Sequence, residues 1–321
     1  MNAILDAAAA VDEKGLAGKA VQTQPDFAGI GDAGTETARP ERFQRYYEEA
    51  GPDYAAWSPE FNMHFGYFRW SMNPFRREAM LEQMNQEVLA RLHLDPGARS
   101  RVLDMGCGLG ASLRSFARQL PRAVLTGITL VPWQLDQGQQ LNRRCLEGRA
   151  IRLMLGDYEH TDLPTGGFDA AYAIESSCYG AGRNKSAFLR EAHRLLRPGG
   201  RLVVADGFVG PGKWRGPQRA IYGKLCDCWA IEMLGDVAKF TREMSRLGFR
   251  DVVVERAQGR VTPSVLHVPW VTLRFLSTAV VFGGRKMTRA RWNNLLAPLL
   301  LPLVGYPIGP VAYYIVSATR T

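Results

Sequence analysis

The chain lacks the cysteine pattern of a disulfide-bonded or metal-binding protein. Its five cysteines are an odd number at irregular spacings: Cys107, Cys145, Cys178, Cys226 and Cys228. A disulfide framework is therefore not expected. The cysteine pattern instead predicts a reducing, cytoplasmic compartment. The closest pair, Cys226 and Cys228, does not form a CxxC motif and has no matching Cys/His pair nearby, so no metal site is predicted.

A dense block of basic residues is also missing. The sequence has 40 Lys and Arg against 31 Asp and Glu, a net charge of +9, and the arginines are spread along the whole chain. Nucleic-acid binding is therefore not expected. The positive balance still fits an anionic partner, such as a phosphorylated substrate or an acidic membrane surface.

The sequence shows no secretory signal and no long apolar run. Its first residues lack a basic stretch followed by an apolar core. The closest approach to a membrane span is Leu295–Val316, which prolines interrupt at positions 298, 302, 307 and 310. Proline breaks helices and leaves backbone carbonyl groups without hydrogen-bond donors in lipid. We therefore expect a buried or surface-associating lobe there. A cytoplasmic protein is expected, with peripheral membrane contact left open.

The composition is that of a globular protein, with 46% hydrophobic and 22% charged residues. Five segments are expected: a mobile tail at 1–38, a helical, aromatic-rich cap at 39–98, a Rossmann-like domain at 99–258, an apolar and basic insertion at 259–310, and a last strand at 311–321. Such a long insertion between two strands is typical of a lid over a substrate.

Strands and helices alternate from residue 100 onward. Strands are expected at residues 101–104, 123–128, 151–155, 168–174, 202–208, 251–256 and 312–318, and helices at 75–92, 111–119, 132–147, 185–196 and 237–247. This alternation predicts an α/β fold with a doubly wound, mostly parallel sheet of seven strands. Ligands of such sheets bind at the carboxyl ends of the strands.

The run from Arg101 to Ser112, RVLDMGCGLGAS, is the most informative segment. Its glycines at alternate positions allow a close backbone approach to a ligand, at the N-terminus of a helix. A dinucleotide site needs G-x-G-x-x-G with an acid about 20 residues later. Here the spacing is G-x-G-x-G, and the second strand ends in Thr129-Leu130, without an acid. A dinucleotide site is therefore not expected. A P-loop is excluded because no Gly-Lys-Ser/Thr follows.

This run resembles the first motif of the class I S-adenosyl-L-methionine (SAM) methyltransferases. Later motifs match in order: Gly156-Asp157-Tyr158 after the third strand, Leu163-Pro164 and Phe168-Asp169 at the fourth, and the "LLRPGG" stretch at 195–200. The resemblance covers roughly residues 43–256. It implies SAM as cofactor, bound by His64, Asp104, Gly106, Gly108, Gly110, Thr129, Leu130, Gln134, Asp157 and Tyr158.

Within this class the chain is similar to sterol 24-C-methyltransferases, tocopherol methyltransferases and cyclopropane fatty acid synthases. The segment at 62–68, NMHFGYF, resembles their H-x-G-Y/F motif, and 173–179, AIESSCY, resembles the fourth strand of the sterol enzymes. Tyr179 stands where those enzymes have His, and the C-terminal third differs from theirs. The resemblance therefore implies a hydrophobic acceptor without naming a sterol.

Methylation of an alkene by SAM produces a cation that must be shielded and deprotonated. Aromatic faces stabilise cations, and a buried carboxylate can act as a base. We predict Glu175, Tyr47 and Tyr67 as catalytic residues, and Tyr46, Trp57, Tyr179 and Trp229 as substrate-binding residues. Aromatic clusters are more often core packing, and Glu175 alternatively only holds a turn or a polar ligand group.

The expected function is C-methylation of a hydrophobic small molecule, such as an isoprenoid or related lipid. The alternatives are an O- or N-methyltransferase of an aromatic natural product, which would share the same SAM-binding half, and a non-catalytic protein that binds SAM or lipid. An oligomer is compatible with the sequence.

Overall fold

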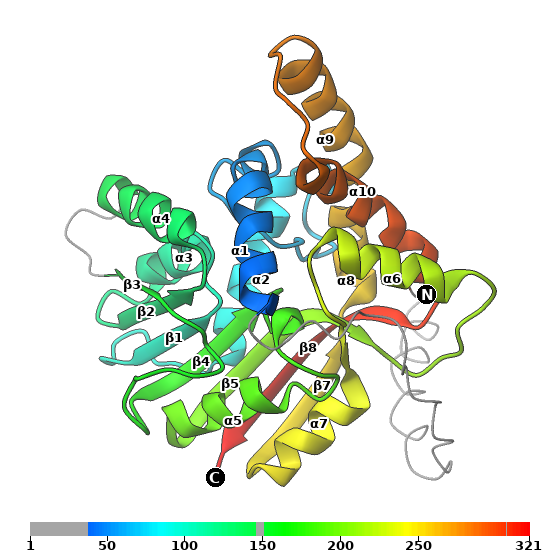
Figure 1. The fold of residues 1–321 in the computed structure, drawn as a ribbon. Helices are drawn as coiled ribbons and strands as arrows, with labels where there is room; N and C mark the ends of the chain where they lie inside the picture. The colour runs from blue at the N-terminus through cyan, green and yellow to red at the C-terminus, as the bar shows by residue number, and fades with distance from the viewer. Residues whose placement is uncertain (1–37, 146–150, 306) are drawn as a thin grey trace, which may run out of the picture. The chain divides into compact units, whose positions relative to one another are not determined.

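The computed structural model describes residues 38–145, 151–305 and 307–321 of the chain, and Figure 1 shows their arrangement. The tail predicted at residues 1–38 lies outside this described part, except for its last residue. The predicted cap contains two helices and the predicted insertion contains three, so both are helical additions to a central sheet.

The sheet is mixed, with one reversed strand. Its strands are β1 (Arg101–Met105), β2 (Val124–Thr129), β3 (Ile151–Leu155), β4 (Phe168–Ile174), β5 (Leu196–Val209), β6 (Gly235–Asp236), β7 (Phe249–Arg256) and β8 (Val311–Arg320). Seven follow the order β3-β2-β1-β4-β5-β8-β7, and the two-residue β6 pairs with β5. Strand β8 is antiparallel to β5 and β7, whereas the remaining pairs are parallel. The predicted Rossmann-like, mostly parallel sheet is confirmed.

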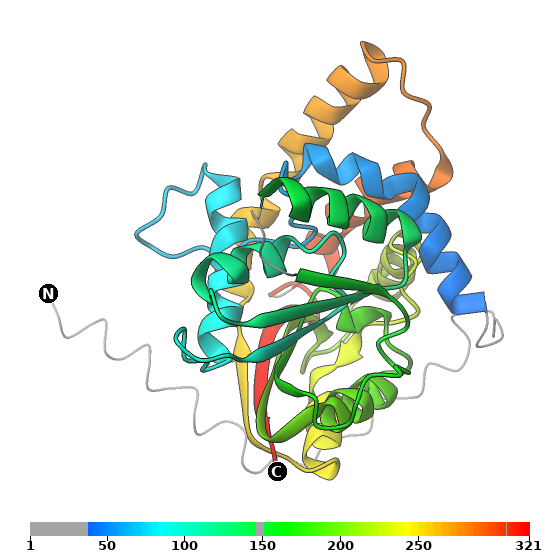
Figure 2. The ribbon, with the colours of Figure 1, turned by 90° about the vertical axis from the view of Figure 1, so that its left-hand side faces the viewer.

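Helices cover both faces of this sheet (Figures 1 and 2). They are α1 (Ala38–Ala50), α2 (Arg77–Arg91), α3 (Ala111–Gln119), α4 (Pro132–Cys145), α5 (Ser186–Leu195), α6 (Gln218–Cys228), α7 (Val237–Arg246), α8 (Gln258–Val265), α9 (Val268–Phe275) and α10 (Arg289–Val304), with short turns η1 (Gly51–Ala56), η2 (Ser177–Tyr179) and η3 (Leu276–Val281). One core layer joins the sheet to α2, α3 and α8, and the other joins it to α5 and α7. Two covered faces explain why the central strands are apolar without alternation.

Strand β5 begins at Leu196 rather than at the predicted Leu202. The helix before it does end at Leu195, as its proline and glycines predict. The chain then pairs at once, because Leu196 lies opposite Phe168 and Arg201 lies opposite Ala170. The Pro198-Gly199-Gly200 stretch therefore forms a bulge inside the strand, where missing donors and small residues are tolerated.

The direction in which successive strands are added to the sheet reverses between β1 and β4. Strand β1 pairs with β2 on one side and with β4 on the other. The crossovers therefore diverge at this point, and the loops at the carboxyl ends of these strands leave a crevice between them. The glycine turn after β1 lies at this edge, next to the ends of β2 and β4.

The insertion between β7 and β8 is helical. Helices α8 and α9 with η3 form one continuous helix, Gln258–Val281, which is long and apolar enough to cross a membrane by length and composition alone. This corrects the expectation that no stretch of the sequence reaches that length, since the helix lies outside Leu295–Val316. That segment divides between α10 and β8, and α10 continues through Pro298 and Pro302.

Candidate functional site

Two cavities open at the carboxyl ends of the strands and share one wall. The first lies over β1, β2 and β4, and the second lies between η1, β5, β8 and the inserted helices. The second is the larger, with a volume of about 170 Å³ against about 90 Å³. The residues that line both are Tyr47, Met63, His64, Glu175 and Tyr179. A ligand in one cavity can therefore meet a ligand in the other at these side chains.

The glycine turn forms the floor of the first cavity. Gly106, Gly108 and Gly110 have φ values of +111°, +51° and +77°, which side-chain-bearing residues rarely adopt. A Cβ on Gly106 would lie 2.4 Å from the Cβ of Ser176. Gly110 does not line the cavity but precedes α3 as its N-cap. The turn therefore brings bare backbone to the ligand and points a helix N-terminus toward it.

Asp104 is the last residue but one of β1 and lies beneath this turn. Its carboxylate accepts a hydrogen bond of 2.7 Å from the Ser112 hydroxyl, which in turn accepts one of 3.0 Å from the Tyr172 hydroxyl. Burial raises the pKa of Asp104 to about 7, and these hydrogen bonds oppose that rise. A cationic ligand group beside the carboxylate would lower this pKa and gain a charge-assisted hydrogen bond.

The end of β2 forms the next part of the wall, without a carboxylate. Thr129, Leu130 and Gln134 all line the first cavity, as predicted. The Thr129 hydroxyl donates to the Gln134 amide oxygen at 2.6 Å, and the Leu130 carbonyl accepts from Gln44. The amide group is thus held by the threonine at the rim of a cavity that can take a sugar hydroxyl.

The loop after β3 closes the far side. Asp157 and Tyr158 line the first cavity. The Asp157 carboxylate accepts from the backbone N–H of Glu159, and the Tyr158 hydroxyl donates to the Ser176 carbonyl at 2.7 Å. Tyr158 therefore ties this loop to the end of β4, so two walls of the cavity are held at a set separation.

Glu175 lies where the two cavities meet. Its backbone is left-handed, with φ +48°, at the position directly after β4. Its carboxylate accepts a 2.7 Å hydrogen bond from the Phe65 N–H. Burial raises the pKa of Glu175 to about 8, and the nearby charge of Asp206 adds to the rise. A left-handed non-glycine residue with a raised pKa, facing a cavity, is typical of a functional site.

Aromatic side chains surround this carboxylate. The hydroxyls of Tyr47 and Tyr179 lie 3.0 Å apart and both rings line both cavities. Trp57 and Trp229 line the second cavity, together with Tyr54. Burial raises the pKa of Tyr47 and Tyr179 well above 10, so both phenols stay neutral. The structure thus brings together five of the residues predicted for the catalytic and acceptor sites, Glu175, Tyr47, Trp57, Tyr179 and Trp229, and their roles stay predictions.

Two predicted residues do not reach either cavity. Tyr67 packs against the core layer of α2 and α3, and its N–H donates to the Met80 carbonyl. Tyr46 is a buried residue of α1, and its hydroxyl donates to the Asn294 amide oxygen at 2.8 Å. The crowding of aromatic residues in this part of the chain does not reveal which rings turn inward. Tyr67 therefore lies outside the site for which it was predicted. Tyr46 reaches the acceptor side only indirectly, since its ring packs against Tyr47 and its hydroxyl contacts Asn294.

His64 lines both cavities, but its ring is already engaged. Its Nδ1 lies 2.9 Å from the Phe65 carbonyl and its Nε2 lies 3.1 Å from the Asn85 amide oxygen. Burial lowers the pKa of His64, and the hydrogen bonds to Phe65 and Asn85 oppose this fall. The ring holds the loop before α2 in place, and its binding of a ligand carboxylate stays a prediction.

Two residues of the second cavity had not been predicted. Asp206 on β5 accepts hydrogen bonds from the Ser177 hydroxyl at 2.7 Å and from two backbone N–H groups. Tyr313 on β8 lies against Glu175 and donates to the Ala205 carbonyl at 3.3 Å. An acid near the end of the fifth strand was a usable signal for Asp206. No sequence signal pointed to Tyr313, because the long insertion separates it from the other residues of the site.

Residues 102–200 match the family described as a methyltransferase domain. The chain is 31% identical over 156 residues to cycloartenol-C-24-methyltransferase of Arabidopsis thaliana, covering 48% of this chain and 44% of that protein. It is 35% identical over 145 residues to an O-methyltransferase of Pyrenophora dematioidea, covering 45% and 52%. The matched part thus spans about half the length of these curated relatives.

The fold is shared with solved structures at lower identity. A cyclopropane synthase of Mycobacterium tuberculosis superposes with a TM-score of 0.74 at 18% identity, covering 88% of this chain and 98% of that one. At this identity the likeness concerns the fold alone.

Proposed function

We propose that the protein transfers a methyl group from SAM to an acceptor in the second cavity, because residues 102–200 match the methyltransferase domain family. The observation that carries the proposal is the shared wall. A glycine turn with its buried acid lies on one side of Glu175, and a larger, mainly apolar cavity lies on the other.

The residues of the first cavity fit SAM. The positive φ values at Gly106 and Gly108 leave room for a nucleoside-bearing ligand against bare backbone. Asp104 would hold the ammonium group, Gln134 the ribose, and Asp157 the adenine amino group. When bound, SAM supplies an electrophilic methyl group. The pyrophosphate grip of a dinucleotide site is not needed for such a ligand.

The residues of the second cavity fit a hydrophobic acceptor. The inserted helices contribute Val261, Val265, Phe275, Leu295 and Leu301 to its lining. Burial of such side chains against an apolar ligand excludes water from the junction, which protects a carbocation from hydration. The rings of Tyr47 and Tyr179 would stabilise positive charge there. C-methylation of an isoprenoid or related lipid follows from this environment.

In this reaction Glu175 would be the base. Transfer of the methyl group to the acceptor's double bond would break the S–CH3 bond and release S-adenosylhomocysteine. The Glu175 carboxylate would then take the proton that the cation loses, and a new double bond would form. The Phe65 N–H orients the carboxylate, and Asp206 keeps the proton affinity high through its charge. Most of the rate enhancement would come from holding donor and acceptor in line.

O-methylation is the second candidate, since one of the relatives above is an O-methyltransferase. In that case Glu175 would remove the proton from a phenol, and the aromatic rings would pack against the acceptor. The two candidates differ in the product, because one yields a new carbon–carbon bond and the other an ether.

The test is incubation of the protein with methyl-labelled SAM and fractionated lipid, prenyl diphosphate and phenol pools. We expect label in an apolar fraction, with a product heavier by one methyl group and carbon-bound by NMR. An ether product would replace the first candidate by the second. SAM binding without label in any fraction would contradict catalysis and favour a binding protein.

Donor binding is expected to depend on pH through Asp104. Because burial raises the pKa of this carboxyl to about 7, it becomes neutral below that pH and loses its attraction for the SAM ammonium. SAM affinity measured by calorimetry should fall as the pH drops from 8 to 6. An Asp104→Asn variant should bind roughly tenfold or more weakly and lose this pH dependence. A pH dependence that persists in the variant would contradict the assignment.

A further inference from the structure

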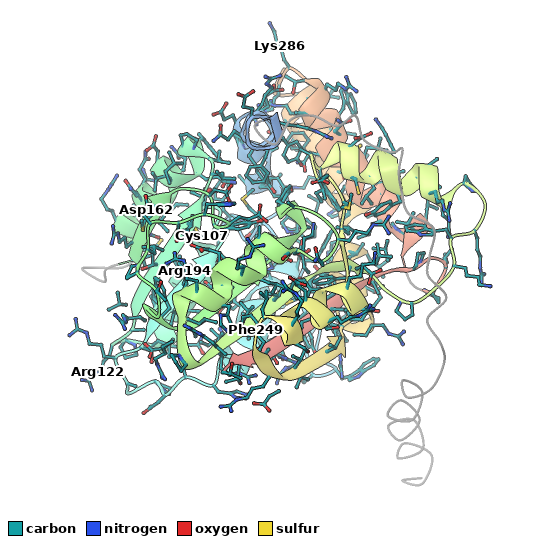
Figure 3. The ribbon with its side chains drawn as sticks, turned by 60° about the horizontal axis from the view of Figure 1, so that its bottom comes forward. Cys107, Arg122, Asp162, Arg194, Phe249 and Lys286 are labelled. Atoms are coloured by element: carbon teal, nitrogen blue, oxygen red, sulfur yellow. The ribbon has the colours of Figure 1, made fainter. Side chains whose placement is uncertain are left out.

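We propose that the helical arm, defined as residues 258–288, docks on an anionic lipid surface together with the loop at residues 69–76 beside it. Within the described part of the chain, α9 projects away from the sheet in both views, and Lys286 lies at the far end of the projection (Figures 1, 2 and 3). The inference goes beyond the proposed function. It rests on that function only for the idea that the membrane would supply the acceptor.

One face of the arm belongs to the protein interior. Val261, Val265, Val268, Thr272 and Phe275, at alternating spacings of four and three, line the second cavity. Val261 and Val265 also belong to the core layer beside α2 and α3. This periodicity places the five side chains on one side of a helix.

The opposite face of the arm is apolar as well, and it is exposed. Leu266, Trp270 and Leu273 repeat the spacing of Val261, Val265 and Val268 five positions later, and Trp270 is 65% exposed. At the tip, Val281 and Phe282 are exposed too, with Phe282 at 82%. A helix that is apolar on both faces requires an apolar environment on the outer one.

The loop at 69–76 extends this surface. It exposes Trp70 and Phe75, at 84% and 86%. It is attached to the arm, because the Arg260 guanidinium lies 5.8 Å from the Trp70 ring centroid and the His267 Nε2 lies 2.7 Å from the Pro74 carbonyl. Large exposed apolar groups gathered over linked segments mark an interaction site. Tryptophans are enriched at membrane interfaces.

The charge around the arm matches an anionic surface. From Ala257 to the last residue the chain has seven Lys or Arg and no Asp or Glu, so this stretch carries +7 of the net +9. Arg285 and Arg291 pair with the buried Asp53 of η1. Arg274 and Lys286 add positive charge along the arm and at its tip. Basic residues next to inserted apolar groups are the pattern of interfacial anchors.

This charge favours a lipid surface over the other occupants of such a face. A second copy of the chain would bring an identical basic surface against this one, and like charges would repel. A membrane crossing would need lipid around the whole helix, whereas its inner face is covered by the core and the cavity. Docking of the outer face alone is compatible with both observations.

The consequence concerns how an apolar acceptor reaches the site. The same helix presents one face to the bilayer and the other to the second cavity. A lipid-soluble acceptor could therefore pass along the arm into the cavity without crossing water, where exposure of its apolar surface costs free energy.

The test is sedimentation of the full chain with vesicles of phosphatidylcholine, with and without phosphatidylglycerol. We expect binding to the anionic vesicles and at least tenfold weaker binding to the neutral ones. The Trp270→Ser/Phe282→Ser variant should lose binding. The Arg274→Gln/Lys286→Gln variant should bind about fivefold more weakly for each charge removed. As matched control, Leu155→Ser/Val253→Ser changes two half-exposed apolar residues of the edge strands β3 and β7 and should bind as the unaltered chain does.

Three results would overturn the proposal. The first is that the unaltered chain does not sediment with anionic vesicles. The second is that the control variant loses binding to the same extent. The third is that the unaltered chain forms a dimer in solution and the Trp270→Ser/Phe282→Ser variant is a monomer. Calorimetric SAM binding should be unchanged in all variants, which also verifies their folding. Vesicle binding and SAM binding are measured separately, so failure of docking is distinguishable from failure of the proposed function.

Discussion

Replacement of Gly106 by alanine is expected to abolish measurable SAM binding. The backbone there has φ +111°, and the added Cβ would lie 2.4 Å from the Cβ and 2.7 Å from the Oγ of Ser176. Ser176 cannot move away easily, because its hydroxyl donates to the Met105 carbonyl at 2.6 Å. Backbone strain of about 1–2 kcal/mol and overpacking of about 1–3 kcal/mol would together displace the turn.

We expect SAM affinity, measured by calorimetry, to fall by roughly a hundredfold or more. The matched control is Gly259→Ala, because a Cβ at Gly259 meets nothing within 4 Å and its affinity for SAM should not change. Thermal unfolding of both variants separates a displaced turn from an unfolded chain. A folded Gly106→Ala protein that binds SAM as tightly as the unaltered chain would show that the donor lies elsewhere.

The second large effect is expected for Glu175→Gln. Glutamine keeps the shape of the side chain and an oxygen that can accept from the Phe65 N–H, but it cannot take a proton. We expect turnover to fall by about 10²- to 10⁴-fold, the usual contribution of a positioned base. SAM affinity should stay within a few-fold, since the donor contacts are made by other residues. Glu48→Gln, which alters an exposed carboxylate of α1 that lines neither cavity, should leave turnover nearly unchanged.

The same residue sets the expected pH dependence. Because the pKa of Glu175 is raised to about 8, the basic carboxylate form increases with pH, and turnover should rise up to and level off above that value. Folded Glu175 also holds its proton to a higher pH than the unfolded chain, whose carboxyl titrates near 4.5. The free energy of unfolding therefore falls as the pH rises from about 4.5 to 8.

The Gln variant should lack the part of this fall that comes from Glu175, whereas the part from Asp104, whose pKa is also raised, should remain. Relative to the unaltered chain, the variant should therefore be more stable at pH 9 than at pH 5. This stability readout is independent of the acceptor's identity. Turnover that does not change between pH 6 and 9, or full turnover in the Gln variant, would exclude Glu175 as the base.

The donor half of the site could be predicted because its parts are local in sequence. Asp104, Gly106 and Gly108 lie within five residues, and each other donor-side segment directly follows a strand. In a parallel sheet the carboxyl ends of neighbouring strands meet at one edge. Strand prediction, together with the resemblance to methyltransferase motifs, therefore pointed to Thr129, Asp157 and Glu175 as residues of one site.

The acceptor half was predicted less well, because it is built by contacts between distant segments. Tyr67 and Tyr47 are both aromatic and close in sequence, yet one turns into the core and the other into the cavity. Tyr313 reaches Glu175 only because β8 inserts antiparallel beside β5. A strand's place in the sheet is not encoded within the strand itself.

The amino-acid sequence was thus sufficient for the fold class and the glycine turn, since strand periodicity, backbone conformation and strand-end chemistry are set by neighbouring residues. The course of the inserted helices, the meeting of two cavities at Glu175 and the exposed apolar arm emerged only from the folded chain. Each depends on which side of a helix or strand faces the core, and that is decided by the packing of segments far apart in sequence.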